Sequence, residues 1–177
     1  TRVDARGNVT AYVYDALDRM TVVTNALGYA TTTTYDAVGN KLTESDALGR
    51  TTTSVYDAKD RLVEVTDPEG GVTTYEYDTN DNQTSETDPL GRTTTTQYDA
   101  LNRLTHVTDP LNHTTVYGYD VEGNRTSTRD ANGRTTNFTY DAVDRLTRVT
   151  DPLLNATDYV YDAVGNKISV TDANGNT

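Results

Sequence analysis

The two histidines are the first candidates for chemistry in this chain. His106 and His113 lie seven residues apart on opposite sides of an Asp109-Pro110 turn, so their imidazoles could face each other across a hairpin. No cysteine accompanies them, and threonine and aspartate are as common elsewhere in the chain. No phosphate loop, nucleophile elbow or metal-binding helix motif is present. We therefore expect both to be strand or turn surface residues, and we expect no catalytic residue and no enzyme.

A second candidate is a short oxygen-rich segment at residues 78–82. Asp78-Thr79-Asn80-Asp81-Asn82 offers oxygen atoms at alternate positions, as calcium loops do, but it lacks the downstream bidentate glutamate. A polar hairpin turn is the favoured interpretation, and a calcium-dependent filament is the weaker alternative. We expect no cofactor and no metal.

Composition excludes several classes of protein. The 177 residues carry a net charge of -12 and no cysteine, with 34% hydrophobic residues and a mean hydropathy of -0.70. The negative charge disfavours nucleic acid as a partner, and no apolar run approaches the roughly 20 residues that span a bilayer. Aromatic and β-branched residues are still plentiful, which argues for a folded chain with a thin core. The chain begins and ends within a repeat pattern, so we interpret it as a fragment of a longer protein.

That pattern is a Tyr-Asp pair that recurs every 21 residues. The eight pairs are Tyr14-Asp15, Tyr35-Asp36, Tyr56-Asp57, Tyr77-Asp78, Tyr98-Asp99, Tyr119-Asp120, Tyr140-Asp141 and Tyr161-Asp162. A fixed period of this length indicates one supersecondary unit stacked on copies of itself. Because a reaction seldom needs eight copies of one group, we assign these pairs a structural role of packing and turn initiation. Residues 1–177 are then a single array of about eight repeats.

Each repeat contains two turns. Three residues after the Tyr-Asp aspartate stands a residue that tolerates positive φ, at Asp18, Gly39, Asp60, Asp81, Asn102, Gly123, Asp144 and Gly165. Ten residues after that aspartate a second turn opens, at Asn25, Asp46, Asp67, Asp88, Asp109, Asp130, Asp151 and Asp172. All four prolines follow such an aspartate, and Asp-Pro-x-Gly predicts a type I turn whose fourth residue forms a G1 bulge.

The segments between turns predict short strands. They hold five or six residues rich in threonine, valine, tyrosine and leucine, such as residues 9–14 and 62–66. We expect about sixteen antiparallel strands and essentially no helix: an all-β array of hairpins forming one long, coiled sheet strip. Alternation places each Tyr-Asp tyrosine on one face with the residues two and four before it, and we expect this to be the packed face.

Two positions depart from the pattern. Leu154 stands where glycine or asparagine is expected, and a leucine at positive φ costs about 1–2 kcal/mol. We therefore expect that turn to shift so that Asn155 takes the positive φ. Gly118 interrupts a strand before Tyr119 and predicts a bulge or a close backbone approach.

A longer period overlies the first. The residue four after each Tyr-Asp aspartate alternates between arginine and asparagine: Arg19, Asn40, Arg61, Asn82, Arg103, Asn124, Arg145 and Asn166. The repeating unit is thus 42 residues. Either successive repeats have different surroundings, or a 42-residue segment was duplicated without structural meaning, and the sequence does not distinguish the two.

The repeated Tyr-Asp-Ala-x-Gly/Asp-Arg-Leu-Thr followed by Asp-Pro-Leu-Gly-Arg-Thr-Thr resembles the RHS or YD repeat. It is nearly complete at residues 98–107 and 88–96, and the resemblance covers essentially the whole chain. The family includes bacterial surface or secreted proteins, polymorphic toxins, toxin-complex subunits and animal teneurins. The resemblance implies a β-sheet strip wound into a hollow shell, which in the toxins encloses a C-terminal effector. No self-cleavage site or catalytic residue of the family has a counterpart here.

The function we expect is a non-catalytic structural module, the wall of such a shell or of an extracellular fibre. A carbohydrate- or cell-surface-binding adhesive module is the alternative, since rows of Tyr, Thr, Asn and Asp suit glycans. Expected partners are flanking repeats or other copies of the chain, an encapsulated effector or glycans, without nucleic acid or membrane insertion. The expected location is extracellular or at the cell surface, in bacteria.

Overall fold

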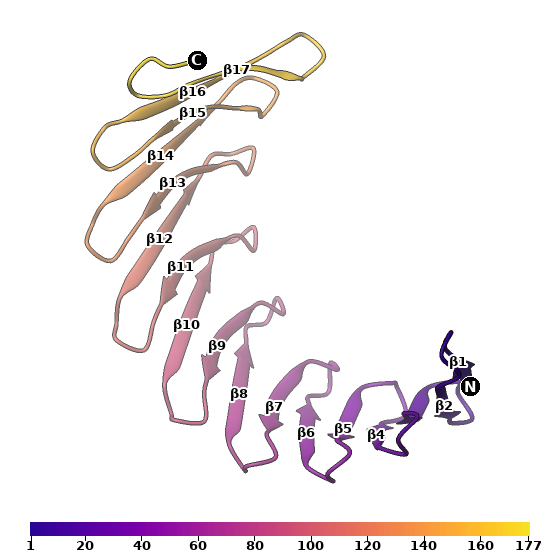
Figure 1. Ribbon diagram of the computed structural model, residues 1–177. Coiled ribbons are helices and arrows are strands. Elements are labelled where there is room, and N and C mark those ends of the chain that lie inside the picture. The colour runs from indigo at the N-terminus through magenta and orange to yellow at the C-terminus, as the bar shows by residue number, and fades with distance from the viewer. The chain divides into compact units, whose positions relative to one another are not determined.

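The computed structural model describes residues 1–177 and contains strands and turns only (Figure 1). The chain forms two compact units: residues 1–77 with 85–92, and residues 78–84 with 93–177. We call them the N-terminal unit and the C-terminal unit. Strand β9 (Gln83–Thr87) contributes residues to both. The all-β, antiparallel fold class predicted from the sequence is confirmed.

Apart from the two-residue first strand, the strands alternate between six and five residues in length. The N-terminal unit holds β1 (Arg2–Val3), β2 (Val9–Tyr14), β3 (Met20–Thr24), β4 (Ala30–Tyr35), β5 (Lys41–Ser45), β6 (Thr51–Tyr56), β7 (Leu62–Thr66) and β8 (Val72–Tyr77). The C-terminal unit holds β10 (Thr93–Tyr98), β11 (Leu104–Thr108), β12 (Thr114–Tyr119), β13 (Arg125–Arg129), β14 (Thr135–Tyr140), β15 (Leu146–Thr150), β16 (Ala156–Tyr161) and β17 (Lys167–Thr171). Every six-residue strand ends on the tyrosine of a Tyr-Asp pair.

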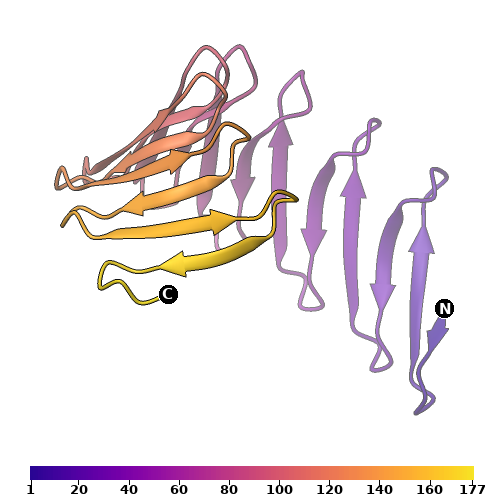
Figure 2. The ribbon, with the colours of Figure 1, turned by 90° about the horizontal axis from the view of Figure 1, so that it is seen from above.

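Within each unit, consecutive strands pair antiparallel, so the chain is a series of hairpins (Figure 2). The register shifts by one residue just before each tyrosine. In the β12–β13 pair, Gly118 lies opposite Ser127, whereas Tyr119 lies opposite Arg125. The same shift precedes Tyr35 in β4–β5 and Tyr140 in β14–β15. A bulge next to the turn is therefore a constant feature of the repeat.

Of the two alternatives expected for Gly118, a bulge is present, and the close approach is to a side chain and not to backbone. A bulge follows it, and a Cβ added there would come within 2.5 Å of the Ser127 Oγ. The bulge itself does not require glycine, since Val13, Thr34 and Val55 occupy the same position in other repeats. The close approach to Ser127 is what distinguishes this copy.

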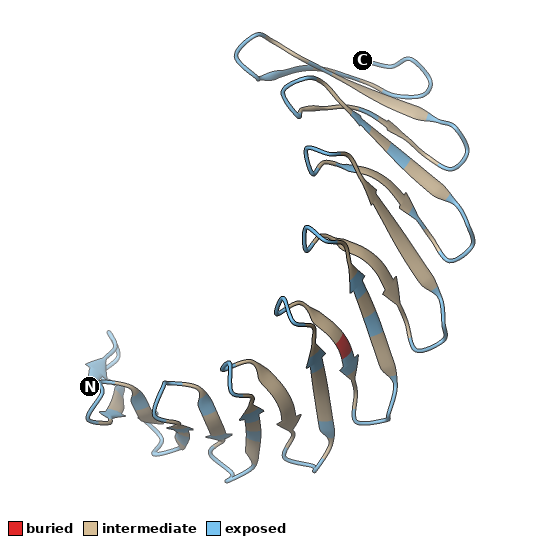
Figure 3. Cartoon of the chain, turned by 180° about the vertical axis from the view of Figure 1, so that it is seen from behind, coloured by how far each residue is buried: buried red, intermediate tan, exposed pale blue.

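The sheet has no buried apolar core. No hydrophobic side chain is buried, and Ser85 in β9, at 9% exposure, is the one buried residue (Figure 3). In β14, Phe138 and Tyr140 are half-buried, while Asn137 and Thr139 between them are exposed. The tyrosine face is thus the less exposed face, as predicted, but it is covered only in part. The structure holds no helix able to cross a membrane.

The turns have the predicted geometry. In the Tyr98-Asp99 turn, the Asn102 N–H donates to the Asp99 carbonyl, and the Asp99 N–H donates to the Arg103 carbonyl. Asn102 has a φ of 60°. This combination is a type I turn followed by a G1 bulge, and it recurs at both turns of the repeat. All eight predicted positions after the Tyr-Asp aspartates have positive φ: Asp18, Gly39, Asp60, Asp81, Asn102, Gly123, Asp144 and Gly165.

The prediction for the turn at residues 151–155 is wrong. Leu154 itself has a φ of 68°, and the turn keeps the common length, with the Leu154 N–H donating to the Asp151 carbonyl at 3.0 Å. Asn155 is held in place by other bonds, because its backbone N–H and its side-chain amide both donate to the Asp151 carboxylate, at 2.9 Å each. The Leu154 side chain is 82% exposed and meets no clash beyond its own backbone.

We predict that Leu154→Asn stabilises the protein by about 1 kcal/mol, because asparagine adopts positive φ at lower cost than leucine. Asn112 already occupies the equivalent position of another turn, with a φ of 63°. Urea denaturation measures the change. Leu153→Asn is the matched control, since Leu153 is equally exposed at 81% but lacks positive φ. Equal effects of the two substitutions would contradict this account.

Candidate functional site: the aspartate-closed turns

Every turn of the chain is closed by the side chain of its first residue. In the turn led by Asp99, the carboxylate Oδ1 accepts the backbone N–H of Leu101 at 2.9 Å and that of Arg103 at 3.0 Å. The bond from the residue four positions on is present in all turns of both units. Aspartate and asparagine suit this position because their short side chains bring an acceptor oxygen to backbone N–H groups two and four residues on.

The residue four positions after the aspartate also contributes its side chain, a contact that the sequence analysis missed. Arg103 Nε donates to Asp99 Oδ2 at 2.7 Å, and Asn82 Nδ2 donates to Asp78 Oδ2 at 3.0 Å. In the second turn of the repeat, Arg92 binds Asp88 in the same manner. The signal was available in the sequence, because arginine, asparagine or histidine occupies this position in nearly every turn.

These bonds favour the ionised aspartate. The side chain of Arg61, together with backbone N–H groups, lowers the pKa of Asp57 from 3.8 to about 2. Hydrogen bonds from Arg92 and Asn166 likewise lower the pKa of Asp88 and of Asp162. The carboxylates of Asp57, Asp88 and Asp162 therefore stay ionised in the folded protein to a lower pH than an ordinary aspartate does.

Six of the Tyr-Asp tyrosines connect their repeat to the one before it. The Tyr119 hydroxyl donates to the carbonyl of Leu104, fifteen residues earlier, at 2.9 Å. The same bond is made by Tyr35, Tyr77, Tyr98, Tyr140 and Tyr161. A phenol can therefore cover the sheet with its ring and still satisfy a backbone carbonyl of the preceding hairpin.

Arginine and asparagine copies make different junctions between successive Tyr-Asp turns. At an arginine junction, the Arg103 guanidinium lies over the Tyr119 ring, 4.8 Å from its centroid, and donates to the Asp120 carbonyl at 2.7 Å. Arg145 makes the same two contacts with the next repeat. These side chains are 24% and 31% exposed, against 63% for Arg92 in the second turn.

At an asparagine junction, the amide reaches the positive-φ residue of the next repeat. Asn82 Nδ2 donates to Asn102 Oδ1 at 2.9 Å, and Asn124 Nδ2 donates to Asp144 Oδ1 at 2.7 Å. The two residue types of the 42-residue period thus make different contacts with the following repeat. An arginine copy contacts the tyrosine ring and a backbone carbonyl of the next repeat, whereas an asparagine copy contacts the side chain of its positive-φ residue.

The two histidines make separate local contacts, and Asp78 is bonded within its own turn. His113 Nδ1 lies 3.0 Å from Asp109 Oδ2 and takes the place that arginine or asparagine holds in other turns. His106 Nδ1 lies 3.0 Å from the Thr105 hydroxyl, so the structure does not bring the two imidazoles together. The carboxylate of Asp78 accepts hydrogen bonds from Asn80 and Asn82 within its own turn. No group of three or more histidine and acidic residues is arranged to hold a metal ion.

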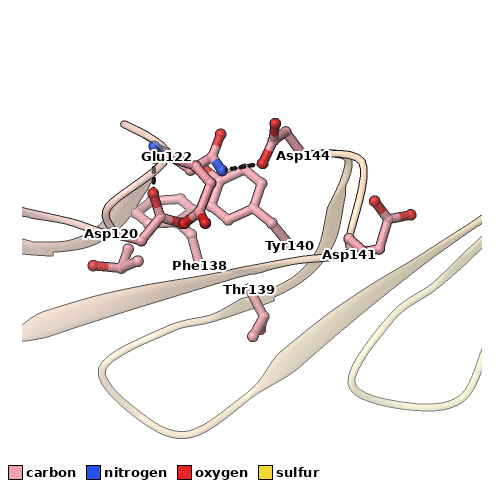
Figure 4. A pocket seen from close by; sticks show the side chains of 10 residues that line it. Asp120, Glu122, Phe138, Thr139, Tyr140, Asp141 and Asp144 are labelled. Carbon is pink, nitrogen blue, oxygen red and sulfur yellow. Dashed lines mark hydrogen bonds between the residues drawn. The ribbon is translucent and has the colours of Figure 1, made fainter.

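One hollow of about 400 Å³ lies between two Tyr-Asp turns of the C-terminal unit (Figure 4). Its lining includes four carboxylates and two aromatic rings: Asp120, Glu122, Asp141, Asp144, Phe138 and Tyr140. Figure 4 shows the two rings side by side beneath Glu122, with Thr139 directed to the other side of the strand. The hollow is open to solvent.

The fold and the turns define a β-repeat protein in which an aspartate closes each hairpin. The family described as RHS Repeat matches residues 1–30, 35–72, 56–93, 77–114, 98–135, 119–156 and 140–177. The chain belongs to the RHS repeat family. No curated protein sequence matches it.

Two solved structures have a similar fold. A Tc holotoxin pore of Photorhabdus luminescens with a mutant TccC3 is 21% identical, with a TM-score of 0.67, and the match covers 81% of this chain and 9% of that chain. A crystal structure of TcdB2-TccC3-TEV is 17% identical, with a TM-score of 0.51, covering 92% of this chain and 11% of that chain. The chain thus spans about a tenth of the length of these relatives. At this identity the likeness concerns the fold alone.

We predict that Tyr119→Phe destabilises the protein by about 1 kcal/mol, because the Leu104 carbonyl loses its hydroxyl partner. Thermal or urea unfolding measures the change. Tyr117→Phe, two residues earlier on the same strand, is the control, since the Tyr117 hydroxyl makes no hydrogen bond. A loss of the same size in both variants would mean that the hydroxyl bond contributes nothing.

We also predict that acid unfolds the protein by protonating the turn aspartates. Because the folded pKa of Asp57, Asp88 and Asp162 is lowered, the stability that these groups contribute is fully present above the unfolded value of 3.8 and is lost as the pH falls through the folded values, which for Asp57 is about 2. Urea midpoints should be constant above about pH 5 and then decline. Asp57→Asn keeps the Oδ1 acceptor, as Asn25 does in its turn, and should weaken this pH dependence. A midpoint unchanged down to about pH 2 would refute the prediction.

Proposed function

We propose that this chain is a non-catalytic structural module, a length of wall built from RHS repeats. The observation that carries the proposal is that the polar side chains that could serve in an active site, chiefly aspartate carboxylates, instead close the turns in which they lie. The Asp99 carboxylate, for example, accepts three hydrogen bonds, all from Leu101 and Arg103. A group that is saturated in this way in copy after copy supports structure and not reaction.

In this proposal residues 1–177 are a single array, and the eight Tyr-Asp pairs are its structural sites. Further repeats are the natural partners, since tyrosines such as Tyr119 and arginines such as Arg103 make bonds to a neighbouring repeat. An array of this kind presents unpaired strand edges at its ends, which flanking repeats of the same protein or other copies would cover. Coiling of the strip belongs to the same proposal.

The larger assembly that we propose follows from the family resemblance. The chain would contribute to a shell around an effector, in a protein secreted by a bacterium or placed on its surface. The matched structures support this choice, because they are Tc toxin assemblies whose RHS-like portion has the same fold.

The alternatives have less support. Threonine rows suited to glycans are in part paired with each other, as in Thr34 with Thr43 at 2.6 Å and Thr108 with Thr114 at 2.9 Å. These hydroxyls stabilise neighbouring strands. The Asp78 carboxylate, the first of the candidate calcium ligands, accepts three hydrogen bonds within its own turn, which gives the calcium alternative less support.

The structural proposal predicts that the array tolerates extension by one 42-residue unit. A second copy of residues 98–139 inserted after Thr139 lengthens the 177-residue chain by about a quarter, and the urea m-value should rise by about the same fraction. The β-sheet circular dichroism should be retained.

A 21-residue duplication of residues 98–118 is the matched control. It keeps the strand pattern but places two arginine copies in succession. Its free energy of unfolding should therefore rise less than that of the 42-residue duplication. If the 42-residue insertion abolishes folding, as an insertion into a compact globular domain would, the chain is not an extendable wall.

A further inference from the structure

The hollow beside Asn124 corresponds to a space that an arginine side chain fills at the arginine junctions. It lies between the turn led by Asp120 and the next Tyr-Asp pair, Tyr140-Asp141. One repeat earlier, the corresponding space between the Asp99 turn and the Tyr119 ring holds the guanidinium of Arg103. Asn124 stands at the position of Arg103, and its short amide does not fill the space.

The arginine junction shows which groups a guanidinium contacts at this position of the repeat. Arg103 donates to Asp99 Oδ2 and to the Asp120 carbonyl, and its guanidinium lies over the Tyr119 ring. The equivalents around the hollow, 21 residues later, are Asp120 Oδ2, the Asp141 carbonyl and the Tyr140 ring. All three belong to residues that line the hollow.

Asp120 differs from the other Tyr-Asp aspartates in that its Oδ2 has no partner. Its carboxylate accepts one bond, to Oδ1 from the Asn124 N–H at 2.7 Å. The Oδ2 atoms of the other copies each accept a bond from the side chain four residues on, at Asp15, Asp36, Asp57, Asp78, Asp99, Asp141 and Asp162. Asn124 instead directs its amide to Asp144. A half-buried carboxylate oxygen is thus left facing a hollow.

Two further residues make this junction the most acidic and aromatic of the asparagine junctions. Glu122, which has no partner, stands where Val38 and Asn80 stand in other copies, and Phe138 stands where Ser54 and Thr96 stand. The nearby cations already have partners, two of which are the lining residues Asp141 and Phe138. Arg145 binds Asp141 and the Asp162 carbonyl, and Arg125 lies over the Phe138 and Tyr117 rings.

We propose that this hollow binds an arginine side chain of a partner polypeptide. The incoming guanidinium takes the place that Arg103 takes in the preceding junction, with Asp120 Oδ2 and the Asp141 carbonyl as acceptors and the Tyr140 ring beneath it. Glu122 at the rim adds attraction for the cation. The inference is independent of the wall function, since a module that forms a wall can carry this site or lack it.

N-acetyl-arginine amide is the probe, titrated into the 177-residue protein at low salt and followed by amide chemical shifts. Saturable shifts should centre on Asn124 and Asp141. The uncharged isostere N-acetyl-citrulline amide should bind at least about ten-fold more weakly, because it lacks the charge that the carboxylates and the ring attract. N-acetyl-lysine amide should also bind more weakly, since an ammonium lacks the planar fork.

The decisive variant is Asn124→Arg, which fills the hollow from within as Arg103 does in its own junction, and it should abolish binding of the probe. Asn82→Arg changes the net charge equally at another asparagine junction of the same unit and should leave binding unchanged. Glu122→Val, with the residue of the Val38 copy, should weaken binding. Absence of saturable shifts in the unmodified protein, equal binding of arginine and citrulline amides, or equal losses in Asn124→Arg and Asn82→Arg would each overturn the proposal.

Discussion

The structure depends on one hydrogen bond, from the backbone N–H of the fourth residue after a turn aspartate or asparagine to the Oδ1 atom of that residue. This bond is present in every turn, and it replaces the buried apolar contacts that close hairpins in most β proteins. Because no hydrophobic side chain is buried, the sheet relies on ordered turns and on backbone pairing. Because the same bond recurs from turn to turn, its contribution to stability is spread along the chain.

Contacts between neighbouring repeats join the turns into a sheet. The tyrosine hydroxyl reaches a carbonyl of the preceding hairpin, and the arginine or asparagine reaches the following Tyr-Asp turn, as Tyr119, Arg103 and Asn124 show. Exposed ion pairs are worth little by themselves, but Arg103 is largely covered and also contacts a ring. Each junction thus combines several weak interactions on one side chain, which favours the alternation of two junction types.

This alternation links structure to the proposed binding site. In the arginine junction the chain supplies its own cation, whereas in the asparagine junction at Asn124 the amide turns to Asp144 and leaves Asp120 Oδ2 without a partner. A repeat protein that acts mainly as a wall can acquire a binding site in this manner with few substitutions. The wall proposal and the site proposal therefore rest on the same geometry but not on each other.

The sequence by itself determined the strands, both turns and the positive-φ positions, because these are local choices: aspartate accepts nearby N–H groups, and Gly39 or Asn102 tolerates φ values that most residues avoid. Tertiary structure alone decided what lies 15 to 20 residues apart in sequence, such as the Tyr119–Leu104 bond and the Asn124–Asp144 bond. At Leu154 the local preference and the tertiary structure disagree. Local preference disfavours its φ of 68°, but the register of the flanking strands and the bonds of Asn155 to Asp151 fix the turn. Distances across a sheet follow from how hairpins pair, and that information is not contained in any one repeat.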